Sequence, residues 1–393
     1  MENVYIVNGA RTAFGAFGGS FKKTSATELG TITAKEAMKR SSVKAEAIDH
    51  VIYGNVIHSS ANAAYLARHI GLNAGVPKEI GAYTVNRLCG SGAQSIVNAA
   101  QHILLREADV VLAGGAENMS MSPYVNFSQR FSGPKMGNLQ FEDMLLATLI
   151  DKYTGSGMGM TAEKLAEQYS ISREEQDQFS IESNLRAAEA MENGCFAEEI
   201  VPVEVKTRRD SIVVNKDEHI KPNVTTDSMA KLKPSFKKNG TVTAGNASGI
   251  NDGAASVIVA SKSAIDKHKL QPIARIVSWG TAGVDPTIMG IGPVPAIKQA
   301  LARANLALGD IDLFEINEAF AAQYLAVEKQ LGLERSIVNV HGGAIALGHP
   351  VGVSGTRITL SAAYELRRRK GKYAVASLCI GGGQGIALVM ERI

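Results

Sequence analysis

The stretch Val85-Asn86-Arg87-Leu88-Cys89-Gly90-Ser91-Gly92-Ala93 connects an extended run to an amphipathic helix. The helix is predicted from Ala93 to Leu104, because its apolar residues recur at spacings of three and four. A thiol at the first turn of a helix faces free backbone N–H groups and the positive end of the helix dipole, and both favour the thiolate. Cys89 is therefore a candidate nucleophile. The alternative is a small buried cysteine that packs a strand–helix turn.

This glycine turn has a second copy later in the chain. Cys89-Gly90-Ser91-Gly92 is echoed by Gly352-Val353-Ser354-Gly355, and the segment around Ile48 is echoed at the same separation by that around Ile311 (352 − 89 = 263 and 311 − 48 = 263). Each turn is followed by a helical pattern and then by an apolar strand that ends in glycines. We therefore expect two homologous α/β halves, each with a largely parallel sheet.

The domain boundaries are predicted from the duplication and from a change in composition. Residues 1–118 together with 250–270 are expected to form the N-terminal half, and residues 271–393 the C-terminal half. Residues 119–249 are rich in Met, Lys, Ser and Gly and contain one clear helix that starts with a capping sequence at Ser172. An insertion of this length usually carries substrate or subunit contacts.

Composition excludes several classes of protein. The chain has 393 residues, of which 45% are hydrophobic and 20% charged, and its net charge of +3 is too small to indicate nucleic-acid binding. Its three cysteines form no Cys-x-x-Cys pair, which fits free thiols in a reducing compartment and a cytoplasmic location. No apolar run approaches ~20 residues, so no membrane span is expected. No two of the eight histidines have the spacing of a metal site on one helix face.

Chemistry is expected where the strands end, because ligands of open α/β sheets bind beyond the carboxyl ends of the strands. Cys89 has this position in the first half. Cys379 and Asn317 follow strands of the second half, and His349 lies in a nearby turn. The four side chains meet only if the halves pack about a pseudo-twofold axis. The alternatives are a core cysteine, a turn histidine and an asparagine that caps a helix.

Four blocks together resemble the active-site blocks of the thiolases, a family of coenzyme-A-dependent C-acyltransferases. The resemblance spans the whole chain and implies a five-layered α/β/α/β/α fold, an inserted loop domain that holds coenzyme A, and a homodimer or homotetramer. The blocks are Asn86-Arg87-Leu88-Cys89-Gly90-Ser91-Gly92, Asn317-Glu318-Ala319-Phe320-Ala321, Gly342-Gly343-Ala344-Ile345-Ala346-Leu347-Gly348-His349-Pro350 and Cys379-Ile380-Gly381-Gly382-Gly383-Gln384-Gly385.

The resemblance also implies roles for individual residues. Cys89 is expected to take the acyl group as a thioester, and His349 to accept its proton. Cys379 is expected to be the second acid/base. One oxyanion hole would consist of His349 and a water held by Asn317, and the other of the backbone N–H groups of Cys89 and Gly381.

Coenzyme A thioesters are the expected ligands, and no cofactor is expected to be bound permanently. The positions that match the family's coenzyme A contacts lie mostly in or beside the inserted segment. They are Ala244 and Ser248 for the pantetheine arm, Lys221, Ser228 and Phe236 for the nucleotide end, and Met158, Ala319 and Phe320 for the acyl end.

The predicted reaction is the reversible condensation of two acetyl-CoA to acetoacetyl-CoA and coenzyme A, the reaction of acetyl-CoA C-acetyltransferase. Met289-Gly290 resembles the short-chain enzymes and favours this reading. The alternative is a broader 3-ketoacyl-CoA thiolase, because Gly157-Met158-Gly159 stands where acetoacetyl-CoA enzymes often have His-Met-Gly. A relative that only binds coenzyme A or lipid would be expected to lack Cys89, His349 or Cys379, and all three residues are present. A NAD-dependent oxidoreductase would need a Gly-x-Gly-x-x-Gly turn between a strand and a helix, and the sequence contains no convincing example.

Overall fold

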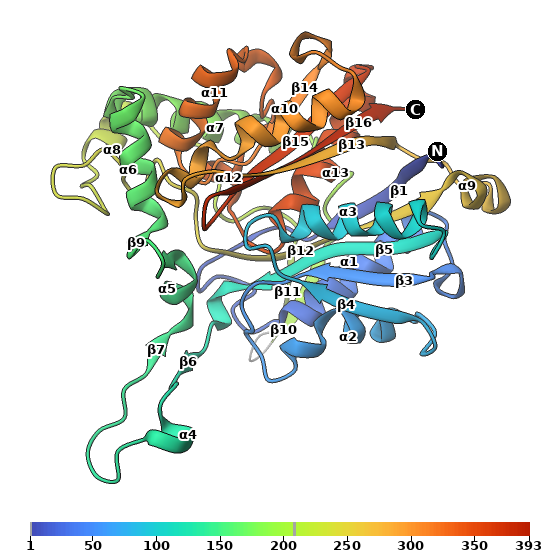
Figure 1. Ribbon diagram of the computed structural model, residues 1–393, viewed down its shortest axis with the longest axis horizontal. Coiled ribbons are helices and arrows are strands. Elements are labelled where there is room, and N and C mark those ends of the chain that lie inside the picture. The colour runs from blue at the N-terminus through green and yellow to red at the C-terminus, as the bar shows by residue number, and fades with distance from the viewer. Residues whose placement is uncertain (1, 207–209) are drawn as a thin grey trace.

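The computed structural model describes residues 2–206 and 210–393. Met1, in the predicted N-terminal half, and residues 207–209, in the predicted inserted domain, lie outside the described residues. The main sheet has ten strands in the order β14-β15-β16-β13-β1-β12-β5-β3-β4, with the short β2 beside β12 (Figure 1). The strands are β1 (Val4–Arg11), β2 (Gly15–Ala16), β3 (His50–Gly54), β4 (Gly81–Val85), β5 (Val110–Asn118), β12 (Asn251–Ser261), β13 (Ala274–Gly283), β14 (Leu313–Ile316), β15 (Tyr373–Ile380) and β16 (Gln384–Arg392).

The strand order displays the duplication. The run β3-β5-β12-β1 of the first half is matched by β14-β15-β16-β13 of the second, and the runs meet where β1 pairs with β13. The helices that follow the two glycine turns, α3 (Ser91–Leu104) and α13 (Ser354–Arg369), start at equivalent positions (354 − 91 = 263). The prediction of two homologous α/β halves is confirmed.

The expectation of a largely parallel sheet in each half is wrong. Among the described strands of the main sheet, parallel pairing is confined to β3 with β4 and β5, and to β14 with β15. The strands β12 and β16 run antiparallel to their neighbours. The reason is visible at β15 and β16, which are joined by a tight turn with positive φ at Gly382 and Gly383. A connection this short can only join antiparallel strands.

Three large apolar clusters fill the spaces between five layers. The layers are the outer helices of the first half, its strands, the central helices α3 and α13, the strands of the second half and its outer helices. The middle cluster joins α3 and α13 to strands of both halves. On one side α1 (Ala26–Arg40) and α2 (Leu66–Asn73) cover the first half, and on the other α10 (Pro293–Ala304) and α11 (Ala321–Leu331) cover the second (Figure 1). Side chains along each strand alternate between the two faces of the sheet, so one strand contributes to two clusters. Val111 of β5 lies in the middle cluster and Val110 in the outer one. The predicted five-layered fold is thus confirmed.

Small residues let the two halves meet at the ends of their central helices. A side chain at Gly92 would place its Cβ 2.7 Å from Thr356 N, and one at Gly355 would place it 2.2 Å from Ala93 N. The Thr356 hydroxyl donates to Gly92 O at 3.1 Å. The N-termini of α3 and α13 therefore touch, which brings the two glycine turns, and the residues that they carry, to one place.

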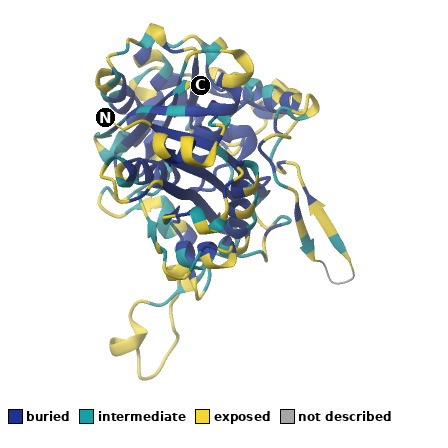
Figure 2. Cartoon of the chain, turned by 90° about the vertical axis from the view of Figure 1, so that its right-hand side faces the viewer, coloured by how far each residue is buried: buried dark blue, intermediate teal, exposed yellow. Residues whose placement is uncertain are grey.

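The inserted segment consists of short elements beside the core. The predicted helix is present as α7 (Arg173–Glu192), and Ser172 and Glu175 form its capping box. A long hairpin around α4 projects from the body with mostly exposed residues (Figures 1 and 2). The other elements are β6 (Tyr124–Val125), α4 (Gln129–Ser132), β7 (Glu142–Asp143), α5 (Met144–Leu149), β8 (Ile150–Asp151), β9 (Ser156–Gly157), α6 (Met158–Gln168), β10 (Val203–Lys206), β11 (Ser211–Val214) and α8 (Thr226–Ala230).

Among the described residues, no helix has both the length and the apolar character needed to cross a membrane.

Candidate active site

Cys89 lies in a strained turn just before α3. The preceding residue, Leu88, has φ 47°, a left-handed conformation that is costly for a side chain of this size. Ser91 supports the turn: its hydroxyl donates to Leu88 O at 2.6 Å and accepts from Arg87 N at 2.8 Å. The Asn86 side chain also accepts from Leu88 N at 2.9 Å. The strain is therefore balanced by hydrogen bonds that fix where the Cys89 sulfur points.

The surroundings of Cys89 keep its thiol protonated. Burial raises the pKa of the thiol to about 11, although the backbone N–H groups of Gly381 and of Cys89 itself bond to the sulfur and oppose the shift. The charge of Glu117 raises this pKa further. The expectation of a thiolate at the helix end is therefore wrong for the free protein, because desolvation outweighs the N–H donors. Attack by this sulfur requires a base that removes the proton.

His349 is such a base. Its Nδ1 lies 2.6 Å from Ser354 Oγ, and that hydroxyl donates its proton to Pro350 O at 3.1 Å. When the hydroxyl donates its one proton to Pro350 O, Nδ1 carries the ring proton, and Nε2 is then free to accept one. Burial, with a smaller effect of the Arg357 charge, lowers the pKa of His349 to about 4. The imidazole is therefore neutral at pH 7.

Asn251, the first residue of β12 in the first half, fixes the backbone of His349. The His349 N–H donates to Asn251 Oδ1 at 3.0 Å. Asn251 also donates from Nδ2 to Gly15 O at 3.0 Å, which ties the side chain to the first half. Val351, two residues after His349, packs in the same apolar cluster as Cys89.

Asn317 and Cys379 complete the predicted set. Asn317 follows β14 directly, and its Nδ2 lies 3.4 Å from His349 Nε2. Its Oδ1 is buried and has no hydrogen-bond partner among the described residues, so it can accept a hydrogen bond from a water or substrate. Cys379 is buried at the end of β15, and burial together with the neighbouring Cys89 thiol raises its pKa. Described contacts thus join Cys89, Cys379 and Gly381 to one another and Asn317 to His349, and Val351 carries the His349 turn into the apolar cluster of Cys89.

Five of the eight predicted coenzyme A contacts form one wall of the site, called here the Phe236 wall. They are Met158, Phe236, Ser248, Ala319 and Phe320. A Cβ on Gly381 would lie 3.3 Å from Met158 Sδ, which places this methionine beside the nucleophile. The ring of Phe236 meets that of Phe320 edge-on, with 6.0 Å between the ring centres. Ser248 donates its backbone N–H to Ala319 O at 3.0 Å. The wall therefore joins the inserted segment to the start of α11.

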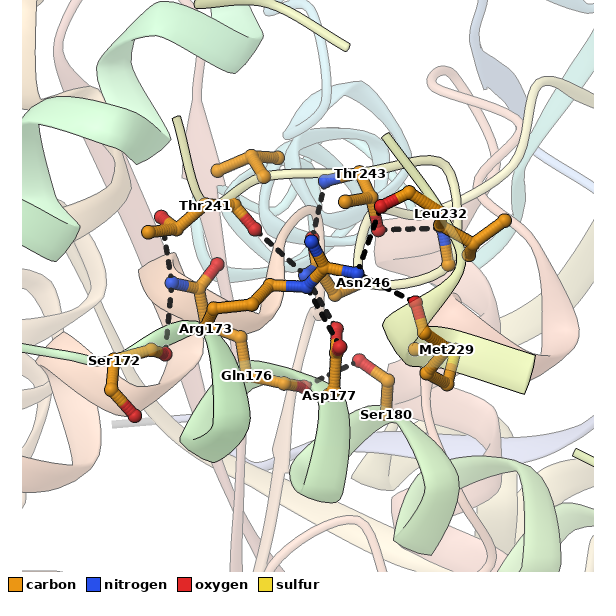
Figure 3. Close-up of polar contacts among 12 residues, drawn as sticks. Ser172, Arg173, Gln176, Asp177, Ser180, Met229, Leu232, Thr241, Thr243 and Asn246 are labelled. Carbon is orange, nitrogen blue, oxygen red and sulfur yellow. Dashed lines mark hydrogen bonds and ion pairs between the residues drawn. The ribbon is translucent and has the colours of Figure 1, made fainter. Parts of the chain in front are cut away.

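The segment that carries Ala244 is held by α7 (Figure 3). Asp177 accepts from Asn246 Nδ2 at 2.9 Å, and Gln176 donates to Thr241 Oγ1 at 2.9 Å. Ala244 itself is exposed between buried neighbours, as a ligand contact requires.

The other two predicted contacts are exposed, Lys221 on the loop before α8 and Ser228 in the first turn of α8. Lys221 donates its backbone N–H to Asn184 at 2.9 Å. The Ser228 hydroxyl donates to Thr225 O at 2.7 Å within the capping box of α8. No described contact joins either residue to the Phe236 wall.

A cavity of about 340 Å³ opens next to the nucleophile turn, within the size range of ligand pockets. It is bounded on one side by Gly381 and Leu88 and on the other by the inserted segment. Its lining residues are Val56, Asn86, Leu88, Ala147, Thr148, Ile150, Asp151, Lys152, Met158, Gly381 and Gly382. In the part of the chain that the structure describes, no group of three His, Cys, Asp or Glu side chains could hold a metal ion.

Two residues that position His349 were missed by the sequence analysis. Ser354 is the duplicate of Ser91 (91 + 263 = 354), and each hydroxyl braces the turn before its helix. Comparing the two turns residue by residue could have identified it. Asn251 is the first residue of β12, after a run of small residues, and gave no signal of its own.

Comparison with known proteins gives matches over the whole chain. Models described as "Thiolase, N-terminal domain" and "Thiolase, C-terminal domain" match residues 4–263 and 270–392. The mitochondrial 3-ketoacyl-CoA thiolase of Mus musculus is 55% identical over 100% of this chain and 99% of its own length. The structure of the human mitochondrial 3-ketoacyl-CoA thiolase in complex with CoA has a TM-score of 0.97 at 52% identity, covering 100% of this chain and 98% of that one. The acetyl-CoA acetyltransferase of Bacillus anthracis has a TM-score of 0.97 at 46% identity, covering 100% and 99%.

Proposed function

Because this chain belongs to the thiolase family, we propose that it is a 3-ketoacyl-CoA thiolase that accepts acyl chains longer than that of acetoacetyl-CoA. The sequence analysis preferred acetoacetyl-CoA and kept this broader activity as the alternative. The names of the relatives support the alternative, since the mouse 3-ketoacyl-CoA thiolase is 55% identical and the Bacillus anthracis acetyl-CoA acetyltransferase 46%.

The observation that carries the chain-length proposal is the cavity beside Gly381 and Met158. Gly157, at the start of α6, adds no side chain to this region. A Cβ there would face Leu149 O at 3.7 Å and Ile150 Cγ1 at 3.9 Å, and Ile150 lines the cavity. An acyl tail can therefore leave the thioester toward the inserted segment.

In the cleavage direction, Cys89 attacks the 3-keto carbon while its proton passes to His349 Nε2. A bond forms between sulfur and that carbon, and the bond between the substrate's second and third carbons breaks. The electron pair leaves on acetyl-CoA as an enolate, which takes a proton from Cys379. The thiol of free coenzyme A then passes its proton to the Cys379 thiolate and attacks the acyl thioester. The shortened acyl-CoA is released, and the departing Cys89 sulfur recovers its proton from His349.

Two sets of donors stabilise the negative charge that develops. The backbone N–H groups of Cys89 and Gly381 already point at the sulfur, so they can receive the oxygen of the tetrahedral intermediate. The proton gained by His349 Nε2 and a water held by Asn317 Oδ1 can receive the enolate oxygen. Neither set requires reorganisation of the chain during the reaction.

Replacing Asn317 by alanine should lower turnover roughly 10²- to 10³-fold, the usual effect of losing one oxyanion-hole donor. The dissociation constant of coenzyme A should change little, because none of the five residues of the wall changes. Steady-state kinetics and calorimetric binding would separate the two quantities. Asn98→Ala, on α3, is the matched control. A loss of affinity with unchanged turnover would contradict the role of Asn317.

Replacing Gly157 by histidine should narrow the range of substrates. The imidazole would enter the region of Ile150, so thiolysis of 3-ketohexadecanoyl-CoA should fall roughly tenfold or more while that of acetoacetyl-CoA persists. Rates over the series between these substrates would test the proposed function of the unmodified protein as well. Gly309→His, at an exposed site with open space around it, is the control. Equal losses on all chain lengths would contradict the proposal.

The remaining expectations stay proposals. We propose the division into residues 1–118 with 250–270, 119–249 and 271–393, with coenzyme A held by the middle unit and no cofactor bound permanently. The structure of the human relative with CoA supports this ligand. A homodimer or homotetramer and a cytoplasmic location stay predictions, and the name of the mouse relative places that protein in mitochondria.

A further inference from the structure

A fully buried carboxylate lies behind the nucleophile, and the proposed reaction does not use it. Glu117, near the end of β5, has no exposed surface. Its Oε1 accepts from Asn55 Nδ2 and Ile57 N, both at 3.0 Å. Its Oε2 accepts from Val56 N at 2.9 Å and from Gly352 N at 3.0 Å. Each oxygen thus has two N–H donors, an arrangement that fits the ionised form.

These donors come from both halves of the molecule. Asn55, Val56 and Ile57 follow β3 in the first half, whereas Gly352 belongs to the glycine turn of the second. A Cβ on Gly352 would lie 2.5 Å from Glu117 Oε2, so only glycine lets this backbone reach the carboxylate. A single side chain therefore ties the two repeats together at the site.

The groups that Glu117 holds are also the ones that surround the reacting residues. Val56 and Ile57 pack in the apolar cluster that contains Cys89 and Val351. Gly352 stands between His349 and Ser354, whose hydroxyl fixes the ring proton of that histidine. Displacement of the carboxylate would therefore shift the nucleophile and its base relative to each other.

We propose that Glu117 is a positioning residue for acyl transfer, which holds Cys89 and His349 in register across the two repeats. The role rests on the proposed function. Two titratable groups, Asp252 on β12 and the Cys89 thiol, interact electrostatically with this carboxylate. Burial raises the pKa of Glu117 to about 8 in spite of its backbone donors. The backbone donors oppose this shift, and the carboxylate is ionised above this pH, the range in which the Cys89 thiol titrates.

Glu117→Gln is the first test. The amide keeps the shape but replaces one acceptor oxygen by an N–H₂ group, which would face two N–H donors. Formation of the acetyl thioester on Cys89, followed by intact-protein mass at saturating acetyl-CoA, should slow roughly 100-fold, because small misplacements of reacting groups cost this much. The dissociation constant of coenzyme A should stay within about twofold of the wild-type value.

A matched variant separates positioning from general stability. Glu199→Gln changes another buried carboxylate, whose partners are Arg11 and Ser361. It should lower the melting temperature and leave the rate of acylation near that of the wild type. Equal slowing in both variants, or acylation of Glu117→Gln within about twofold of wild type, would overturn the proposal.

A second readout uses the charge of Glu117. Alkylation of Cys89 by iodoacetamide should move to lower pH in Glu117→Gln, because the negative charge that raises the thiol pKa is gone. Glu117→Asp keeps the negative charge but, being one methylene shorter, draws it back from its N–H donors. This variant should lose acylation without the shift of the alkylation profile to lower pH. It also replaces the glutamine variant if that one does not fold. An unchanged alkylation profile in Glu117→Gln would count against the role. If the wild type formed no thioester at all, the proposed function itself would fail, and this role with it.

Discussion

Replacing Cys89 by serine should abolish turnover and remove the covalent adduct that acetyl-CoA leaves on the protein. The hydroxyl would keep the position set by Leu88 and Ser91 but is a far weaker acid and nucleophile than the thiol. Loss of the nucleophile from a coupled catalytic group typically lowers turnover on the order of 10⁴- to 10⁶-fold. The fold should survive, since the turn is held by backbone and serine contacts that the substitution leaves intact.

Peptide mass spectrometry after mixing with acetyl-CoA measures this directly. The wild type should carry one acetyl group on the peptide that contains Cys89, and the serine variant none. Cys195→Ser is the control, because Cys195 is the one cysteine of the chain outside the site, and it should keep both adduct and turnover. An adduct on Cys195 or Cys379 in the serine variant would refute the assignment of the nucleophile.

The protonation states of Cys89 and His349 shape the pH dependence of this step. With the thiol pKa at about 11 and the imidazole pKa at about 4, both groups are neutral near pH 7. A stable thiolate–imidazolium pair is therefore disfavoured in the free protein. Proton transfer becomes favourable as the sulfur attacks, because the backbone N–H groups of Cys89 and Gly381 then stabilise the new oxyanion.

The duplication made the two homologous halves predictable from the sequence, and the resemblance to the thiolases supplied the five layers and the candidate site residues. A repeated turn at a fixed separation implies equivalent helices and strand ends, and these place Cys89 and His349 near the same axis. Strand direction was not predictable, because a buried apolar run such as β16 reads the same in either direction. The thiol pKa was not predictable either, since the helix position of Cys89 is a local feature whereas its burial depends on the packing of the folded chain.

Residues that act through others were the hardest to identify. Glu117 was not among the residues predicted for the site, and one of its N–H donors, Gly352, is 235 residues away in the sequence. The chain-length range was hard to predict for a related reason. Met289-Gly290 favoured a short-chain enzyme, but the space available to an acyl tail depends on how Gly157 and Ile150 pack in three dimensions.

Replacing Cys379 by alanine should separate the two halves of the reaction. Cys89 and His349 are untouched, so the acetyl thioester should still form on Cys89 and should accumulate. Condensation and cleavage should fall roughly 10²- to 10⁴-fold, the contribution of a general acid or base, because no group remains to move the proton at the second carbon of acetyl-CoA. The backbone of β15 should be preserved, since a buried alanine suits this strand.

Exchange of deuterium into the methyl group of acetyl-CoA provides the decisive measurement. In the wild type the Cys379 sulfur should remove and return this proton, so label should enter; in Cys379→Ala it should not, even though mass spectrometry shows the acyl enzyme. Cys195→Ala should exchange normally. Full condensation by Cys379→Ala would assign the proton to another group.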